Sequence, residues 1–426
     1  MIDQTVLFFS FLATVVVAIF SFLVVRDAWA RAALLLLQGS LFVNSGVAVA
    51  YYDVPAWFAI YHFGFLFVCL ASFIFFWKFS GPFAVHVANR VEMARDFCQQ
   101  PRFVLVVLGL FYLALLSSLV YPEFRLSLLF ELRPPDLRAW FAERFESVER
   151  GGVEAVVRYV RLLFFPFIFI VFYRFKDRPR IVFLLVFMLL YIQYVDRQYI
   201  ARGTVLLFVL CVGLFYFVEY PRTRKWLLIF GLSSVPVLAV LLEYWMVVRL
   251  GGVYEFKGVW ASLERILVMQ TSFTRDAGLA LIESGLHVDL QKYFAWLLTL
   301  PIPKALIGQV DGARVNLEIS EIVLGVQRGA PGFYVILGGV VAESVYIFGG
   351  DLFWLHGLIL GAIGAVLIRL LSAVSYFGFL TAWTVVFFSY KLAGAGVGAV
   401  LPPLINEYLL LYIFMAYAVN RYSGRR

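Results

Sequence analysis

Residues 57–77 read WFAIYHFGFLFVCLASFIFFW, a run that contains no Asp, Glu, Lys or Arg. A helix needs roughly 20 predominantly apolar residues to cross the hydrocarbon core of a bilayer, and this run has that length. Ten further apolar stretches occur along the chain: 4–25, 32–51, 103–121, 160–173, 181–196, 203–218, 226–245, 352–371, 375–391 and 402–420. The pattern predicts an all-α, polytopic membrane protein with about 11 transmembrane helices, within a range of about 10–14.

The composition supports a membrane protein and argues against a soluble one. Of the 426 residues, 63% are hydrophobic and only 15% are charged. The net charge of +8 does not indicate a nucleic-acid partner, because the basic residues form short clusters between apolar runs, as the positive-inside rule predicts. The first run extends to Val25 without a basic residue before it, so we expect an uncleaved first helix rather than a signal peptide.

The basic clusters also assign the connectors to the two sides of the membrane. Lys and Arg clusters predict cytoplasmic segments at 26–31, 78–102, 174–180, 222–225 and 421–426. The alternate connectors are then exterior: 52–56, 122–159, 197–202, 246–351 and 394–400. This alternation holds only if the apolar residues 333–348 do not cross the membrane. We therefore expect this glycine-rich segment to be re-entrant or to lie at the membrane surface, and to line a cavity.

Two of the exterior connectors are long. In residues 122–159 the apolar side chains from Leu137 to Val148 fall on one helical face, which predicts an amphipathic helix on the membrane surface. That helix either shields the bundle or takes part in function. Residues 246–351 carry many charged side chains, and such a connector can house chemistry on one side of a bilayer. With no repeat and no soluble domain, residues 1–426 are predicted to form a single transmembrane domain.

The chain lacks the motifs of several enzyme classes. It has no Gly-rich phosphate loop followed by Lys, no His-Glu-x-x-His and no Cys-x-x-Cys. The sequence therefore supports neither an ATP-driven enzyme nor a zinc hydrolase. It also has no Asp-x-Asp, which argues against a divalent metal that holds a nucleotide sugar. The exterior connectors do carry arginines, whose planar, permanently charged guanidinium binds phosphate oxygens in a bidentate manner. Converging arginines can replace a metal at a diphosphate leaving group, so we expect no metal site.

Three segments resemble elements of the O-antigen polymerase family, within the O-antigen polymerase and ligase superfamily. Residues 196–203 (DRQYIARG) are similar to the Ser-Arg-Gly start of a membrane helix, with Ala201 in place of Ser. Residues 300–306 (LPIPKAL) are similar to an Ile-Pro-Arg-x-Leu element of the large periplasmic loop, with Lys304 in place of Arg. Residues 338–350 (GGVVAESVYIFGG) resemble a Gly-Glu-x-Tyr-x-x-Phe-Gly element before the next helix. The three occur in the family's order.

The resemblance implies a GT-C-like membrane glycosyltransferase of the bacterial inner membrane. Such an enzyme transfers a glycan from its undecaprenyl diphosphate carrier to the non-reducing end of another lipid-linked repeat unit. The reaction takes place on the periplasmic face and builds O-antigen, the polysaccharide of lipopolysaccharide, or a related surface polysaccharide. Because the donor is already activated, no cofactor is implied. The implied partners are the undecaprenyl-diphosphate-linked oligosaccharide, membrane lipids, a chain-length regulator and a flippase.

The predicted site combines exterior cations with one acid. Arg202 is the first catalytic candidate, because it stands at an exterior helix end where a diphosphate at the interface can reach it; a snorkelling arginine is the alternative. Arg275 is the second, and a structural ion pair is the alternative for it. The remaining cations are expected to bind diphosphate or glycan: Arg197, Arg249, Arg265, Lys304, Arg314 and Arg328.

Glu343 is the predicted general base for the acceptor hydroxyl. An acid held in an apolar, glycine-rich segment is suited to proton transfer. The alternative is that Glu343 pairs with a nearby arginine and orients the connector, because structural ion pairs also place carboxylates in such settings. His287 is a second candidate base, in a stretch that the sequence predicts to be an exposed turn.

Two other functions stay open. An O-antigen ligase uses the same donor with lipid A core as acceptor, but the loop of that family typically carries a catalytic His beside an Asn, and this chain has no His-Asn pair. A lipid-linked oligosaccharide flippase would carry charged residues inside helices that line a central cavity, whereas most charges here lie between the apolar runs.

Overall fold

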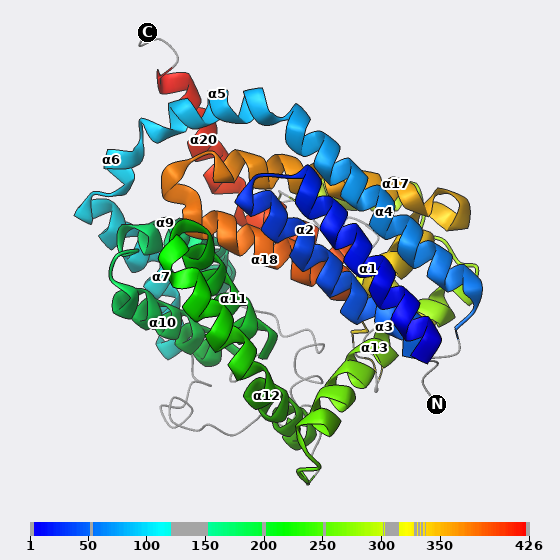
Figure 1. Cartoon of the computed structure of the whole chain (residues 1–426). Helices are drawn as coiled ribbons and strands as arrows, with labels where there is room; N and C mark the ends of the chain where they lie inside the picture. Colours follow the sequence, from blue (N-terminus) through cyan, green and yellow to red (C-terminus); the bar gives the residue numbers. More distant parts are fainter. Residues whose placement is uncertain are drawn as a thin grey trace. The chain divides into compact units, whose positions relative to one another are not determined.

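The computed structural model describes residues 4–51, 54–120, 152–197, 202–249, 253–300, 302, 315–327, 330, 333, 335–336 and 338–422 (Figure 1). Within these ranges every regular element is a helix and no strand occurs. The predicted all-α class is confirmed. Its physical basis is that a helix satisfies its backbone N–H and C=O groups inside one segment, as a bilayer requires.

The chain divides into two compact units, each assembled from segments that are far apart in sequence. Unit 1 contains Met1–Ala84, Glu264–Leu370 and Thr384–Ile405. Unit 2 contains Val85–Leu263, Leu371–Trp383 and Asn406–Arg426. Each unit therefore packs helices from the first part of the chain against helices from the last part.

The N-terminal part of unit 1 is built around α2 (Ala28–Leu41), against which α1 (Gln4–Val24) and α4 (Ala56–Phe79) pack (Figure 1). The side chain of Asp27 begins α2, because it accepts the backbone N–H groups of Trp29 and Ala30. A π-helical segment, η1 (Phe42–Gly46), joins α2 to α3 (Val47–Tyr51). Beyond α4 the chain continues as α5 (Gly81–Glu92).

The remainder of unit 1 comes from the long connector and the helices after it. α13 (Val259–Glu283), α14 (Leu290–Thr299) and α16 (Val315–Leu324) lie in the connector 246–351, where the sequence analysis predicted no helix. α17 (Gly339–Ser372) is broken at Gly349, which has a φ of 78°. The first residues of α18 (Gly378–Ala395) belong to unit 2 and the rest of this helix belongs to unit 1. After Gly396 the chain continues as α19 (Val397–Pro402) and the π-helical η5 (Pro403–Glu407).

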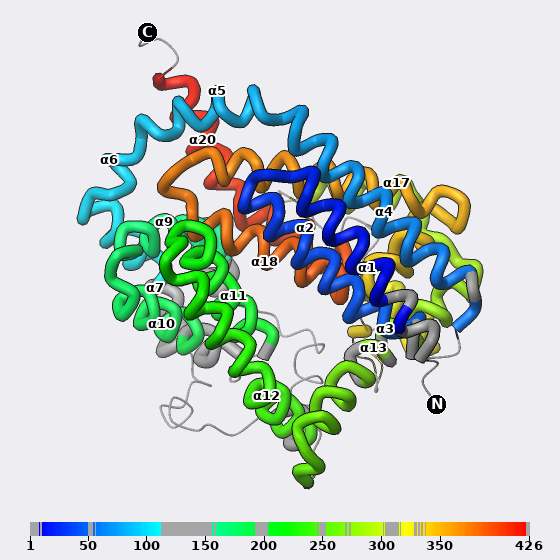
Figure 2. Tube along the Cα trace, in the orientation of Figure 1, coloured from blue at the N-terminus to red at the C-terminus, as the bar shows by residue number. Residues whose placement is uncertain are grey.

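Unit 2 is a bundle in which α9 packs against α7 and α20, and α11 packs against α12 (Figure 2). Its elements are α6 (Arg95–Cys98), α7 (Pro101–Val120), α9 (Gly152–Arg174), α10 (Pro179–Arg197), α11 (Arg202–Glu219), η3 (Pro221–Thr223), α12 (Arg224–Arg249), η4 (Ser375–Phe377) and α20 (Leu409–Tyr422). Aromatic rings fill the bundle: Trp383 stacks on Phe169 with centroids 5.0 Å apart, and Phe215 stacks on Phe379 at 3.6 Å.

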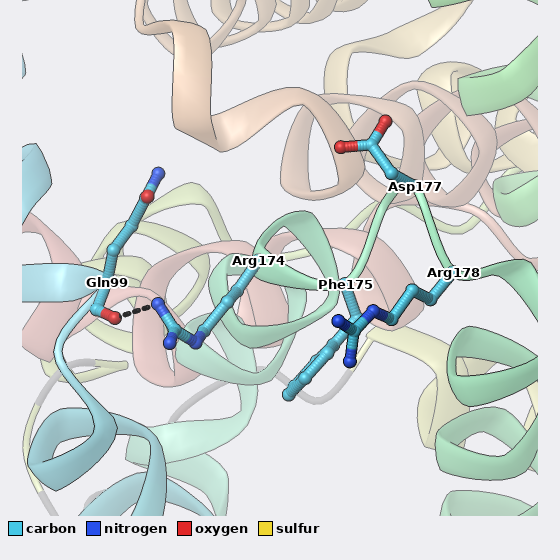
Figure 3. Close-up of a pocket in the computed structure, with 5 residues that line it drawn as sticks. All are labelled: Gln99, Arg174, Phe175, Asp177 and Arg178. Carbon is cyan, nitrogen blue, oxygen red and sulfur yellow. Dashed lines mark hydrogen bonds between the residues drawn. The ribbon is translucent and has the colours of Figure 1, made fainter.

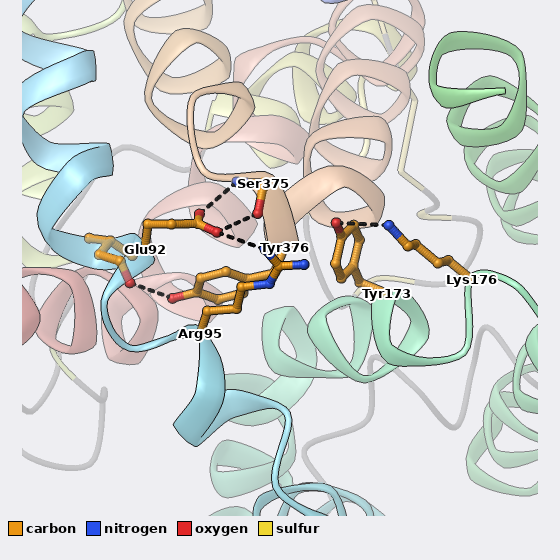
Figure 4. A network of polar contacts seen from close by, with 7 residues as sticks. Glu92, Arg95, Tyr173, Lys176, Ser375 and Tyr376 are labelled. Carbon is orange, nitrogen blue, oxygen red and sulfur yellow. Dashed lines mark hydrogen bonds and ion pairs between the residues drawn. The ribbon is translucent and has the colours of Figure 1, made fainter. Parts of the chain in front are cut away.

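A polar network fixes the end of α5 in unit 2 (Figure 4). The carboxylate of Glu92 accepts the backbone N–H of Ser375 at 3.0 Å and its hydroxyl at 2.5 Å. The buried hydroxyl of Tyr376 donates to the carbonyl oxygen of Val91 at 3.0 Å. These bonds attach α5 to η4, the turn that precedes α18.

Several helices are long and apolar enough to cross a membrane. Among the described residues five meet this criterion, Ala28–Val49, Trp57–Phe79, Pro221–Tyr244, Gly339–Ser372 and Ser375–Ala395, and the bent pair Val397–Glu407 and Leu409–Tyr422 raises the number to six if it is one span. Shorter apolar helices cover Phe11–Val24, Pro101–Phe111, Pro179–Tyr191 and Gly203–Glu219. The chain is a membrane protein by these helices, and the count of about 11 spans stays a prediction.

Several helices begin and end close to the positions predicted from the apolar runs, but α17 and α9 start well before them. α17 starts at Gly339, whereas the apolar run that predicts it begins at residue 352. α9 starts at Gly152, whereas the sequence analysis began this helix at residue 160 and placed 152–159 in an exterior connector. The amphipathic helix predicted around Leu137 to Val148 lies outside the described residues.

The glycine-rich segment 333–348 contains the first ten residues of α17, and Val340–Ile347 are buried within unit 1. α17 has 34 residues, whereas a crossing needs roughly 20. Beyond the break at Gly349, the second half, 350–372, is long enough to span by itself. The first half is therefore free to be re-entrant, as the charge pattern predicts.

A reporter scan tests this topology. A reporter that is active only in the cytoplasm is expected to work when it is fused at Ser375 or at the C-terminus and to fail at Arg314, because only the second half of α17 crosses. A cytoplasmic signal at Asp351 would contradict a re-entrant segment.

Candidate functional site

The candidate site lies in unit 1, where helices of the long connector pack on the first half of α17. Tyr293 and Trp296 of α14 and Ile319 of α16 form one apolar cluster with Tyr346 and Ile347 of α17. The predicted connector, which carries most of the charged candidates, thus folds in part as helices around the glycine-rich segment. Their apolar faces hold the segment in place.

Glu343 lies in the middle of this segment and is 1% exposed. Its carboxylate accepts the backbone N–H of Val397 and also the N–H of Gly398. These are the first two residues of α19, so Glu343 caps a helix that restarts after the break at Gly396. The first N–H groups of a helix have no partner inside it and carry partial positive charge, which a carboxylate satisfies.

Gly396 is required by this arrangement. Its φ is 72°, in the left-handed region. A Cβ at Gly396 would lie 2.2 Å from the carboxyl carbon Cδ of Glu343. Every larger residue would displace the carboxylate from the end of α19.

Within the described residues Glu343 forms no ion pair with an arginine, and the alternative of such a pair stays open for Arg314 and Arg328, which lie outside them. The partners are backbone N–H groups instead. A buried carboxylate needs compensating hydrogen bonds, and the first N–H groups of α19, which have no partner inside that helix, supply them without a second charge.

Two tyrosines extend the polar surroundings of Glu343. Burial raises the pKa of Tyr293, and the nearby carboxylate of Glu343 raises it further, so Tyr293 keeps its proton at neutral pH. The hydroxyl of Tyr346 donates to the carboxylate of Glu318 at 3.0 Å, and Glu321 interacts electrostatically with Tyr346. Glu318 and Glu321 of α16 and Tyr293 of α14 thus interact with the segment of α17 that carries Glu343 and Tyr346. Carboxyl and phenol groups can exchange protons and bind hydroxyl groups.

A loop from the connector is anchored beside the break in α17. The backbone N–H of Val288 donates to the carbonyl oxygen of Tyr346 at 3.0 Å. The exposed His287 lies next to Gly349, with its Cε1 3.8 Å from the position that a Cβ there would take. The exposure predicted for His287 is confirmed, and this histidine lies at the end of the segment that carries Glu343.

Two further histidines of unit 1, His356 and His62, are buried. His356 is 2% exposed and its Nδ1 lies 2.8 Å from the hydroxyl of Ser344. His62 is fully buried beside Gly46 of η1, and among the described residues neither of its ring nitrogens has a hydrogen-bond partner. Unsatisfied buried polar groups are rare, so His62 marks a second polar position in this unit.

The predicted cations are distributed over both units. Arg275 forms an ion pair with Asp276 at 2.5 Å, as the alternative for it anticipated, and Arg265 is half-buried on the same helix, α13. In unit 2, Arg197 ends α10, Arg202 begins α11 and Arg249 ends α12. Lys304, Arg314 and Arg328 lie outside the described residues.

Sequence reasoning missed three polar side chains. Tyr293 and Glu318 escaped attention because their meeting with α17 depends on tertiary contacts of helices that the sequence analysis did not predict. Glu243, inside the apolar α12, is 2% exposed and accepts the hydroxyl of Ser262 at 2.5 Å. Glu243 could have been found from the sequence, because an acid inside an apolar helix is rare and usually functional.

No group of three or more His, Cys, Asp or Glu side chains in the described ranges is arranged to hold a metal ion. Comparisons with protein-family models, with curated proteins and with solved structures found no match to this chain.

Proposed function

We propose that this protein is a membrane glycosyltransferase of the bacterial inner membrane, with about 11 transmembrane helices in a GT-C-like arrangement. It joins undecaprenyl-diphosphate-linked oligosaccharide repeat units into O-antigen or a related surface polysaccharide on the periplasmic face. The support is the resemblance of residues 196–203, 300–306 and 338–350, in this order, to elements of O-antigen polymerases.

One structural observation carries the proposal furthest. The acid of the third element, Glu343, is buried and caps the N-terminus of α19, Tyr293 lies near enough to interact with its charge, and helices of the long connector pack on the segment that carries it. Apolar surroundings exclude water, which would otherwise compete with the acceptor sugar for the activated donor. An acid in such a place is suited to take a proton from a sugar hydroxyl.

In the proposed reaction the acceptor hydroxyl oxygen attacks the anomeric carbon of the donor glycan. The bond between this carbon and the diphosphate oxygen breaks, and undecaprenyl diphosphate leaves with the bonding electrons. The hydroxyl proton passes to the carboxylate of Glu343, which gives up its N–H partner Val397 when the acceptor enters. Arg202 and Arg275 stabilise the charge on the leaving diphosphate, with Arg197, Arg249, Arg265, Lys304, Arg314 and Arg328 as further cations along the substrate.

The donor is already activated, so the reaction uses no cofactor and no metal. A flippase that delivers the lipid-linked units and a chain-length regulator are the proposed protein partners.

Polymer formation from purified lipid-linked repeat units is expected to persist in excess EDTA, because arginines rather than a cation neutralise the diphosphate. The measurement is the ladder of lipid-linked glycans on a gel, with and without chelator. If EDTA abolishes the ladder and added magnesium or manganese restores it, a metal ion rather than the arginines neutralises the diphosphate.

A second candidate function, a lipid-linked oligosaccharide flippase, is favoured by one observation. Transporters place ionisable groups on discontinuous helices at the bilayer midplane, and here Glu343 caps a half-helix beside two helix breaks, at Gly349 and Gly396. The two functions differ in product: a flippase moves the lipid-linked unit and leaves its length unchanged.

A further inference from the structure

A pocket in unit 2 lies between the connector that follows α6 and the turn that joins α9 to α10 (Figure 3). Gln99, Arg174, Phe175, Asp177 and Arg178 line it. Arg174 is the last residue of α9, and Arg178 directly precedes Pro179, the first residue of α10. None of these residues belongs to the candidate site of unit 1.

The two arginines give the pocket a net positive charge. Arg174 donates to the backbone carbonyl oxygen of Gln99, and neither Arg174 nor Arg178 forms an ion pair within the described residues. The one acid at the pocket, Asp177, accepts the hydroxyl of Tyr220 at 2.7 Å, and Figure 3 shows its carboxylate turned away from both guanidinium groups. Two exposed guanidinium groups without a carboxylate partner fit a phosphate group.

Two helix starts add to this charge. α7 begins at Pro101, two residues after Gln99, and α10 begins at Pro179. The N-terminal end of a helix carries partial positive charge, so both starts favour an anion at the pocket.

The neighbouring helices are apolar on their exposed sides. Leu105 and Val106 of α7 are 70% and 55% exposed, and Phe183 and Phe187 of α10 are 61% and 65% exposed. These side chains follow the pocket by one to two turns along the two helices. A ligand with acyl chains can contact them while its phosphate binds the arginines, whereas a free phosphate ion uses only the arginines.

We propose that this pocket binds the phosphate of an anionic phospholipid headgroup. The lipid joins the starts of α7 and α10 to the end of α9 at the membrane interface, where headgroups and basic side chains meet. This assignment does not depend on the glycosyltransferase proposal.

The experiment measures phospholipid retention by native mass spectrometry of the purified, detergent-solubilised full chain, with phosphatidylglycerol, phosphatidylcholine or inorganic phosphate added separately. The wild-type protein is expected to retain phosphatidylglycerol over phosphatidylcholine. The double variant Arg174→Gln, Arg178→Gln is expected to lower this retention by at least about tenfold, because charge-assisted bonds are lost. Arg178→Gln alone leaves the contact of Arg174 with Gln99 in place and is expected to lower retention severalfold.

The matched control is Arg222→Gln, Lys225→Gln, which removes two exposed charges of the same unit that do not line the pocket, and it is expected to retain phosphatidylglycerol like the wild type. Equal retention by the pocket variants and the wild type would overturn the proposal, as would equal losses in the pocket and control variants. Equal retention of phosphatidylcholine and phosphatidylglycerol would also overturn it. Binding of inorganic phosphate without retention of any phospholipid would overturn the assignment to a lipid.

Discussion

Replacing Gly396 with alanine is expected to destabilise the protein by about 2–4 kcal/mol, because a left-handed backbone and a direct clash act together. The new Cβ would lie 2.2 Å from the Cδ atom of Glu343, so the carboxylate has to leave the N-terminus of α19. The buried carboxylate and the N–H groups of Val397 and Gly398 then lose their partners. The measurement is the thermal unfolding midpoint in detergent together with abundance in the membrane.

Two variants make this result interpretable. Gly213→Ala is the control, because a Cβ there meets nothing within 4 Å, and it is expected to leave the unfolding midpoint unchanged or slightly higher. Glu343→Gln keeps an oxygen that can accept the N–H of Val397, so it is expected to be more stable than Gly396→Ala but to form no polymer. An unfolding midpoint of Gly396→Ala equal to that of the wild type would refute the cap formed by Glu343.

Replacing Arg202 with lysine is expected to lower polymer yield by on the order of ten- to a hundredfold while the protein stays folded and inserted. Lysine keeps the charge but loses the planar fork that binds two phosphate oxygens at once. Arg202 is the first residue of α11, where the helix end itself favours an anion. The measurement is ladder length and yield in a deletion strain that expresses each variant at matched membrane abundance.

Arg222→Lys is the control for this prediction, since Arg222 is an exposed arginine at the start of η3 in the same unit and is predicted to face the cytoplasm. It is expected to give full-length ladders. If Arg202→Lys and Arg202→Ala also give full-length ladders, Arg202 only snorkels to the interface and does not contact the diphosphate.

The membrane helices could be predicted because each depends on one local property, the length of an uncharged apolar run. A run such as 57–77 excludes charged residues over the length of a bilayer crossing, and this property alone predicts the helix that the structure shows as α4. The breaks at Gly349 and Gly396 fall in stretches where glycine allows left-handed backbone, and the sequence analysis marked the first of these stretches as unusual.

The helices of the connector could not be predicted in this way. α13, α14 and α16 are shorter or more polar than a span, and their stability comes from packing on α17 rather than from the apolar length of each segment. Tertiary contacts of this kind leave no simple periodic signal in the sequence.

The acid of the candidate site could be predicted from the sequence, but its hydrogen-bond partners could not. Glu343 stood out as one carboxylate in an apolar, glycine-rich segment, and its burial agrees with that expectation. Its partners are N–H groups of α19, which lies 54 residues further along the chain, and nothing in the sequence links the two positions. Tyr293 and Glu318 were missed for the same reason.

The central claim, glycan polymerisation, is tested most directly with the purified protein in sealed vesicles that contain lipid-linked repeat units from the same organism. The assay scores two products in one sample: the length of the lipid-linked glycan, and the access of the glycan to a hydrolase added outside. A ladder of lengthened glycans is expected with the wild-type protein, and none with Glu343→Gln. Repeat units that become accessible to the hydrolase across the bilayer but keep their original length would contradict glycan polymerisation and identify a flippase.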